Sequence, residues 1–281
     1  MKARIIKPQN CLLPRRDRAG HKGDYGRLLL VAGSLGYTGA PVLAAQGALR
    51  AGAGLVFLGV PENVYPIVAV KCTCAMPFPL PEDCAALEKK AEGCDAALIG
   101  PGLGREEETR RMLLRFISRF AGPLVVDADG INALAGHIDI LDGRQAPTVL
   151  TPHEGEFARL TGCALPVEDR KEAARAFARA HRCVLVLKGS GTVTALPGGE
   201  LFVNPTGHPG MASGGSGDVL AGMIAALLGQ GFEAGWSAYT AVCLHGRAGD
   251  LAAQRLGEYA MTAQDLLDAL PQAVKEAEVS Q

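Results

Sequence analysis

Residues 209–228 read PGMASGGSGDVLAGMIAALL, a glycine-rich run that leads without a break into an apolar helical pattern. Glycines leave backbone N–H groups free to converge, and the N-terminus of a helix adds partial positive charge. The stretch therefore predicts an anion-binding loop at a helix start, and a phosphate is the ligand expected there. Asp218 is expected in the first turn of this helix, where an ordinary helix cap is its alternative role.

Upstream of this stretch, short apolar runs alternate with helical patterns. The apolar runs, several of them rich in β-branched residues, are 28–32, 55–60, 96–99, 124–126, 148–150, 184–187 and 193–196. Helical patterns include 40–50, 106–120 and 168–180, and after the last run 218–228, 235–255 and 263–270. This alternation predicts an α/β fold, a doubly wound, mostly parallel sheet with helices on both faces.

The composition is that of a soluble globular protein. The chain has 281 residues, of which 48% are hydrophobic, and 28 Lys and Arg residues face 29 Asp and Glu residues, for a net charge of −1. That balance gives no reason to expect binding to nucleic acid or to an anionic membrane. The start of the chain lacks the apolar stretch of a signal peptide, so a cytoplasmic location is expected.

Length and cysteine content add two further expectations. A chain of 281 residues can form one large domain or two small ones. No linker divides the sequence, so we expect a single domain over residues 1–281. The eight cysteines contain no CxxC pair and no zinc-finger spacing, which favours free, mostly buried thiols.

The expected strand ends indicate where a ligand would bind, because open parallel sheets bind ligands beyond the carboxyl ends of their strands. The segments that follow the strands are short, glycine-rich or ionisable: 32–34, 100–104, 127–130, 151–154 and 188–192. We therefore place the candidate site at this edge of the sheet.

Two of these segments carry residues that could bind a ligand. In the loop 188–192, KGSGT, a lysine at a strand end favours contact with a phosphate or nucleotide, and an ordinary turn is the alternative. In TPHE, Thr151 at the N-cap, Pro152 at N1 and Glu154 at N3 have the form of a capping box. This interpretation leaves His153 free to face a ligand.

The segment Asp127-Ala128-Asp129-Gly130 offers two carboxylates at a third strand end. They could organise Mg²⁺, water or phosphate, or they could simply cap a turn. Neither GxxxxGK[ST] nor GxGxxG occurs in the chain, which argues against a P-loop enzyme and a standard Rossmann dehydrogenase.

The run GGSGD over 214–218 resembles the signature of the ribokinase superfamily. Further motifs resemble those of the NAD(P)H-hydrate dehydratase family within it, in the expected order over roughly residues 12 to 271. These motifs are HKGDYG at 21–26, GAP at 39–41, RAGAGLV at 50–56, GPGLG at 100–104, DAD at 127–129, TPHEGE at 151–156, KGSGT at 188–192 and PGMASGGSGD at 209–218.

The resemblance implies a ribokinase-like fold and an enzyme that removes water from the S epimer of hydrated NADH or NADPH. It implies that a nucleotide is consumed, ADP in bacterial members, and leaves the choice between ADP and ATP open. Asp218 is implied as the catalytic residue. The residues implied to contact the hydrated cofactor are Ala40, Gly102, His153 and Asp218. Those implied to hold the nucleotide are Lys188, Gly189, Ser190, Gly191, Thr192, Gly214, Gly215, Ser216 and Gly217.

The resemblance also implies partners. Mg²⁺ would bridge phosphate oxygens rather than occupy a protein cage. A separate epimerase would convert the other epimer, and relatives suggest a homo-oligomer, a tetramer. The sequence departs from the family pattern at His208, where Asn is usual.

Two alternatives remain. A small-molecule kinase of the same superfamily, such as a hydroxyethylthiazole kinase, would leave a phosphorylated product. A non-catalytic nucleotide-binding module would bind without turnover.

Overall fold

One mixed sheet organises the molecule. The structure is a computed structural model that describes residues 2–81 and 83–279. Within these residues ten strands form a sheet in the order β1-β10-β9-β8-β7-β6-β5-β2-β3-β4, in which β9 alone runs against the others. The strands are β1 (Arg4–Ile5), β2 (Arg27–Val31), β3 (Leu55–Val60), β4 (Met76–Pro79), β5 (Ala96–Ile99), β6 (Leu124–Val126), β7 (Thr148–Leu150), β8 (Val184–Leu187), β9 (Val193–Ala195) and β10 (Leu201–Val203).

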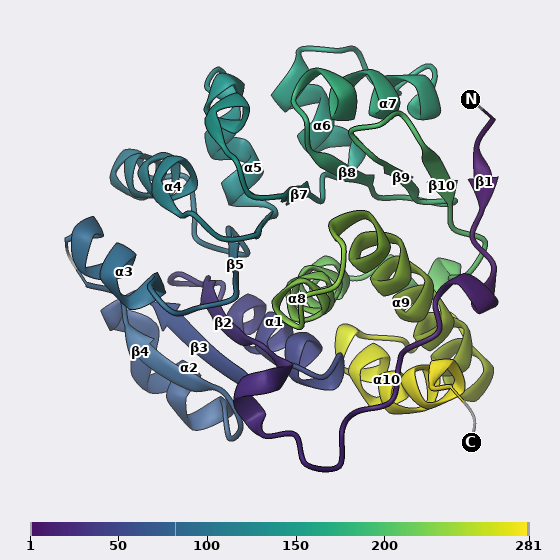
Figure 1. Cartoon of the computed structure of the whole chain (residues 1–281), viewed down its shortest axis with the longest axis horizontal. Helices are drawn as coiled ribbons and strands as arrows, with labels where there is room; N and C mark the ends of the chain where they lie inside the picture. The colour runs from purple at the N-terminus through teal and green to yellow at the C-terminus, as the bar shows by residue number, and fades with distance from the viewer. Residues whose placement is uncertain (1, 82, 280–281) are drawn as a thin grey trace.

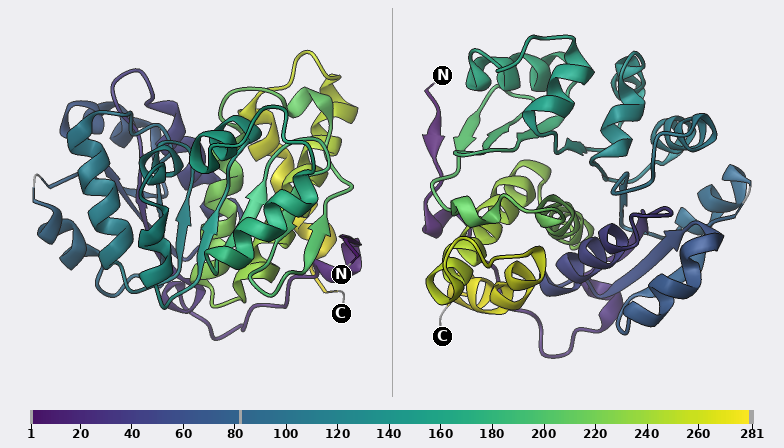
Figure 2. Two further views of the ribbon diagram at one scale, coloured as in Figure 1. Left: turned by 90° about the horizontal axis from the view of Figure 1, so that it is seen from above. Right: turned by 180° about the vertical axis from the view of Figure 1, so that it is seen from behind.

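Helices cover both faces of this sheet (Figures 1 and 2). They are α1 (Gly39–Arg50), α2 (Tyr65–Lys71), α3 (Cys84–Ala91), α4 (Glu107–Arg119), α5 (Asp129–Leu134), α6 (Glu154–Thr161), α7 (Arg170–Ala180), α8 (Ser216–Gly229), α9 (Ala234–Leu256) and α10 (Ala263–Ala277). Buried side chains of α1, α2, α8, α9 and α10 form the core on one face, and those of α3 to α7 form the core on the other. The doubly wound, mostly parallel α/β fold is therefore confirmed.

The central strands lie where the sequence predicts them. The ranges expected at 55–60, 96–99, 124–126, 148–150 and 184–187 are those of β3, β5, β6, β7 and β8. All four residues of β5 and of β8 are buried, as expected for strands that are covered on both faces. Helix α10 runs seven residues beyond its expected end, through Pro271 to Ala277.

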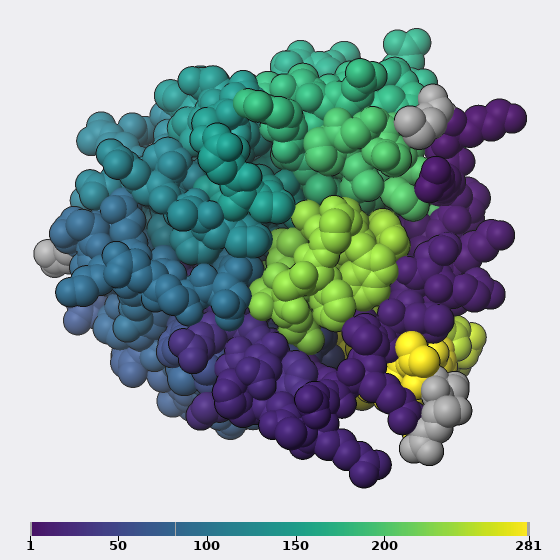
Figure 3. All heavy atoms as spheres, viewed as in Figure 1, coloured from purple at the N-terminus to yellow at the C-terminus, as the bar shows by residue number. Residues whose placement is uncertain are grey.

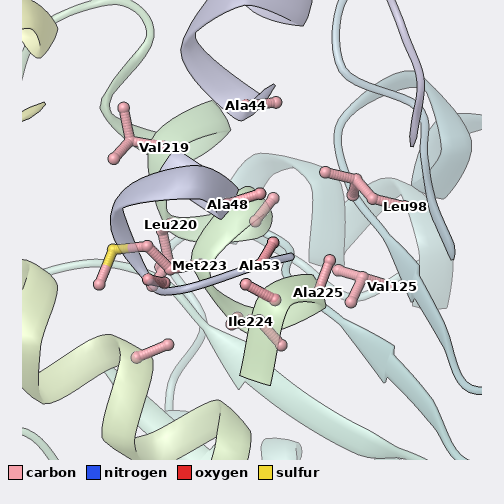
Figure 4. Close-up of a cluster of buried hydrophobic side chains, with 14 of the residues drawn as sticks. Ala44, Ala48, Ala53, Leu98, Val125, Val219, Leu220, Met223, Ile224 and Ala225 are labelled. Atoms are coloured by element: carbon pink, nitrogen blue, oxygen red, sulfur yellow. The ribbon is translucent and has the colours of Figure 1, made fainter. Parts of the chain in front are cut away.

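Helices α1 and α8 touch through their backbones. A Cβ atom at Gly222 would collide with the carbonyl oxygen of Ala44, and one at Gly47 would collide with that of Val219. Figure 4 shows Ala44 on α1 in the same buried cluster as Val219 on α8. This contact places the two helix N-termini side by side, with Leu43 of α1 against the backbone of Gly215.

The N-terminal segment packs against the C-terminal helices (Figure 3, purple beside yellow). The backbone N–H of Leu13 donates to the carbonyl of Ala277 at 2.8 Å, and the indole N–H of Trp236 donates to the carbonyl of Asn10 at 3.1 Å. The cysteines are free, as expected, but only Cys11, Cys183 and Cys243 are buried. No helix in the described part of the chain is long and apolar enough to cross a membrane.

Candidate active site

The carboxyl ends of three neighbouring strands bring Asp127, Thr151 and Lys188 together. The Nζ atom of Lys188 lies 2.8 Å from Oδ1 of Asp127, and the Thr151 hydroxyl donates to the same oxygen at 2.7 Å. Asp127 is 1% exposed, and a lysine ammonium and a hydroxyl satisfy this buried oxygen. Of the two aspartates at this strand end, Asp127 thus anchors Lys188.

The second aspartate, Asp129, serves the turn. Its Oδ2 atom accepts the backbone N–H of Gly104 at 2.9 Å, and its Oδ1 atom accepts from the side chain of Asn132 at 3.1 Å. The turn-capping interpretation therefore describes Asp129. Within residues 2–81 and 83–279 no group of three His, Cys, Asp or Glu side chains could hold a metal ion.

The start of α6 differs from the predicted capping box. The N-cap is His153, whose Nδ1 accepts the backbone N–H groups of Gly155 at 2.9 Å and Glu156 at 3.3 Å. The carboxylate of Glu156 accepts the backbone N–H of His153 at 2.8 Å, which completes the box. The expectation that Thr151 is the N-cap was wrong, because its hydroxyl is bonded to Asp127. His153 therefore has a structural role as well as an exposed ring at the ligand edge.

The glycine-rich loop meets the same cluster at the start of α8. Gly215 adopts a φ of 92°, in the left-handed region that favours glycine. Gly217 lies beneath the ammonium group of Lys188, since a Cβ atom there would be 3.3 Å from Nζ. In the same loop the buried hydroxyl of Ser213 has no hydrogen-bond partner among the described residues. Free helix N–H groups, a nearby lysine and an unpartnered hydroxyl fit an anion such as phosphate.

Asp218 projects from the first turn of α8 into a group of carboxylates. Burial raises its pKa most, the charges of Asp127, Glu156 and Asp129 raise it further, and Lys188 opposes them, so the pKa rises from 3.8 to about 7. A carboxylate with that pKa can take a proton at neutral pH, as a general base must. Burial alone would lower the pKa of Lys188, but Asp127 and Glu156 outweigh it and raise that pKa. Lys188 thus stays cationic.

Ala40 and Gly102, both predicted to contact the cofactor, lie next to each other. A Cβ atom at Gly102 would be 3.0 Å from that of Ala40. The Ser34 hydroxyl donates to the carbonyl of Gly102 at 2.7 Å and joins the loop after β2 to the loop after β5. The structure therefore brings the predicted contacts into two adjoining groups, one at the start of α1 and one at the start of α8.

The site can now be compared with known proteins. A model of the NAD(P)H-hydrate dehydratase family matches residues 28–272. The chain belongs to this family. It is 50% identical over 278 residues to the bifunctional NAD(P)H-hydrate repair enzyme Nnr of Moorella thermoacetica, covering 95% of this chain and 52% of that protein. The chain spans about half the length of this curated relative, and of several others that it matches.

Relatives of similar length also match. The ADP-dependent (S)-NAD(P)H-hydrate dehydratase of Bacillus subtilis is 37% identical over 270 residues, covering 95% of each chain. A crystal structure of the ADP/ATP-dependent NAD(P)H-hydrate dehydratase of that organism, co-crystallized with ATP/Mg²⁺, superposes with a TM-score of 0.87. It is 35% identical, and the match covers 99% of this chain and 100% of that one. The resemblance inferred from the motifs is therefore confirmed.

In this member of the NAD(P)H-hydrate dehydratase family, two histidines support the glycine-rich loop. His208 is the N-cap of the short turn 209–211, and its Nδ1 accepts the N–H of Gly210 at 3.3 Å, a role that Asn also fills well. His245 of α9 is buried, with Nε2 3.4 Å from the Ser216 hydroxyl, and burial lowers its pKa to about 4. His245 is thus a neutral hydrogen-bonding group under the helix start.

The sequence did not single out Glu156, His245 or Arg170 for the site. Glu156 appeared only as the last letter of TPHEGE, and the other two lie on helices that had no motif. Arg170 is the first residue of α7 and donates to three carbonyl oxygens of the segment 187–190. Such contacts join distant parts of the chain, and no local pattern reports them.

Proposed function

We propose that this chain is an ADP-dependent (S)-NAD(P)H-hydrate dehydratase. It removes water from the S epimer of hydrated NADH or NADPH, restores the reduced cofactor, and converts ADP to AMP and phosphate. The observation that carries the proposal is Asp218, a carboxylate with a pKa of about 7 at the mouth of a glycine-rich helix start and beside Lys188. The names of the family and of the relatives support the same activity.

The chemistry follows from the poor leaving ability of hydroxide. Asp218 accepts the proton of the ring hydroxyl, whose oxygen attacks the terminal phosphorus of ADP. The bond from that phosphorus to the bridging oxygen breaks and AMP leaves with the electron pair. The lone pair of the ring nitrogen then expels phosphate, and loss of a proton from the neighbouring carbon restores the reduced ring.

The groups around Asp218 have separate roles in this reaction. The backbone N–H groups of Gly214, Gly215 and Gly217 and the ammonium of Lys188 stabilise the charge on the transferred phosphoryl group, which is the main task in phosphoryl transfer. Loop 188–192 holds the nucleotide. Ala40, Gly102 and His153 hold the hydrated cofactor with its hydroxyl toward Asp218.

The proposal includes Mg²⁺, which binds together with the nucleotide. The cluster of Asp127, Glu156 and Asp218 is acidic, but Lys188 already neutralises part of it and no three-ligand protein group is present in the described residues. These residues therefore fit a Mg²⁺ ion that is bound mainly by the phosphate oxygens of the nucleotide. When bound there, the ion would neutralise charge on the reacting phosphate group.

The wider setting is also proposed. The enzyme works in the cytoplasm as a single-domain chain in a homo-oligomer, a tetramer. An epimerase activity supplies the S epimer. The relatives named as bifunctional repair enzymes are about twice as long as the matched region, which supports a partnership of two activities.

A product assay tests the function. The protein is incubated with hydrated NADH, Mg²⁺ and either ADP or ATP, and the reduced-nicotinamide absorbance and free phosphate are followed. We expect both to appear in equal amounts with ADP. A stable phosphate ester would instead indicate a small-molecule kinase, and ADP binding without turnover would indicate a binding module.

A further inference from the structure

Arg170 fixes the shape of the loop that follows β8. Its Nη1 atom donates to the carbonyl of Ser190 at 2.8 Å, and its Nη2 atom donates to the carbonyls of Leu187 at 3.1 Å and Lys188 at 3.0 Å. One planar guanidinium thus binds three peptide carbonyls within four consecutive residues. The single ammonium group of a lysine, at the end of a flexible side chain, could not bind all three carbonyls in this geometry.

The loop is built to admit this guanidinium. Gly189 has a φ of 143°, and a Cβ atom there would lie 2.8 Å from Nη2 of Arg170. The Thr192 hydroxyl donates to the carbonyl of Gly189 at 2.9 Å and closes the turn. A side chain at position 189 would therefore both strain the backbone and displace the arginine.

Glu154 holds the arginine from the other side. Its Oε1 atom lies 3.0 Å from Nε of Arg170, and both side chains are partly buried. Glu154 is the first residue of α6 and follows His153 directly. The ion pair therefore connects the start of α6 to the loop after β8.

The direction of the carbonyls has a consequence for ligand binding. In a trans peptide the C=O and N–H groups point in opposite directions. Since the carbonyls of Lys188 and Ser190 point at Arg170, the N–H groups of Gly189 and Gly191 point away from it. These N–H groups are left to an acceptor on the other side of the loop.

We propose that Arg170 is a positioning residue for the nucleotide: by binding the carbonyls of 187–190, it turns the N–H groups of loop 188–192 toward the phosphates of ADP. This inference rests on the proposed function, because it takes this loop as the nucleotide site. Arg170 itself faces the carbonyl side of the loop and acts through it.

The test uses Arg170→Lys, which keeps the charge and removes the planar fork. Calorimetry with ADP should show binding about tenfold weaker, the usual scale for losing hydrogen bonds to a charged group. The KM for ADP should rise by a similar factor. The KM for hydrated NADH and the kcat at saturating ADP should stay near their wild-type values.

Arg144 provides the matched control. Its guanidinium also binds three carbonyls, those of Ile117, Phe120 and Gly122, and the Thr148 hydroxyl, at the amino ends of β6 and β7. Arg144→Lys should lower the melting temperature and leave ADP affinity unchanged. Glu154→Gln, which removes only the charge beside Nε of Arg170, should weaken ADP binding in the same direction but less.

The outcomes separate the two proposals. If the wild-type protein binds ADP and Arg170→Lys binds it equally well, the positioning role is refuted while the proposed function stands. If the variant weakens hydrated-cofactor and ADP binding equally, Arg170 is merely structural. If the wild type binds no ADP, the nucleotide assignment fails and this inference fails with it.

Discussion

The ammonium group of Lys188 lies between two buried carboxylates, with Nζ 2.8 Å from Oδ1 of Asp127 and 3.9 Å from Oε2 of Glu156. The lysine does not neutralise all the negative charge around it, because Asp218 adds a third carboxylate to the group. Burial, together with the repulsion from the other carboxylates, raises the pKa of Asp218 to about 7. Asp218 is therefore the carboxylate whose charge changes near neutral pH.

Activity should follow this titration. Only ionised Asp218 can accept a proton, so kcat/KM for hydrated NADH should fall tenfold per pH unit below about pH 7, as expected for one essential base. Initial rates between about pH 5 and about pH 9 measure it. Asp127→Asn removes the largest of the repelling charges and should move the midpoint to lower pH. A midpoint that stays in place in Asp127→Asn would show that another group limits the rate.

Asp218→Asn should separate catalysis from binding. The amide keeps the size of the side chain but cannot take a proton, so kcat should fall at least about a hundredfold. Affinity for ADP and for the hydrated cofactor, measured by calorimetry, should stay near normal. A loss of only a few-fold in kcat would show that Asp218 is not the general base.

The same substitution should stabilise the protein at alkaline pH. The pKa of Asp218 is higher in the folded state than its ordinary value of 3.8, so the wild type loses stability as the pH rises from about 4 to about 7. Asp218→Asn lacks this penalty. Its melting temperature at about pH 8 should exceed the wild-type value by roughly 3 °C or more. The difference should disappear below about pH 4, and a variant that melts lower at every pH would contradict the assignment.

Gly217→Val should abolish nucleotide binding. A Cβ atom added at Gly217 would lie 3.3 Å from Nζ of Lys188. The branched side chain of valine would also fill the space in which the phosphate is proposed to lie. The reason is space rather than backbone conformation, because the positive φ in this loop belongs to Gly215. Gly143→Val, at a glycine with open space around it, is the control and should bind ADP normally. Normal calorimetric titration of Gly217→Val with ADP would remove this loop from the anion site.

His153 should show two separable roles. His153→Ala removes the N-cap of α6 and should cost about 1 kcal/mol of stability, as well as raising the KM for hydrated NADH. His153→Asn restores a good capping group and should recover the melting temperature but not the KM. Thermal melts and initial rates on both variants measure this. Full recovery of the KM by Asn would limit the role of His153 to the cap.

Composition and periodicity predicted the interior of the fold well and its edges poorly. Central strands such as β5 and β8 are continuous apolar runs because both faces are covered, and such runs are visible in sequence. Strand β4 was not predicted, since it contains two prolines and pairs on one side only. The pairing of β1 with β10 joins residues almost two hundred positions apart, and no local pattern reports it.

In the candidate site, too, local sequence patterns predicted some residues, while others depend on contacts between distant parts of the chain. Lys188 and Asp218 could be predicted because strand ends and helix starts meet at one edge of a parallel sheet. The cap of α6 was misplaced by two residues, because Thr151 and His153 are both acceptable caps and only the contact of Thr151 with Asp127 decides between them. Arg170 could not be predicted, since its role depends on three carbonyls that only the folded chain brings to it.

The contact between α1 and α8 bears on how ligands enter and leave. These helices meet at Gly47 and Gly222 with no side chain between their backbones, so neither can slide past the other without breaking close packing. Ala40 and Asp218 lie at the starts of these two helices, so we expect the distance between them to stay fixed during a turnover. We therefore expect any opening and closing of the site to come from the loops at this edge of the sheet rather than from a hinge in the core.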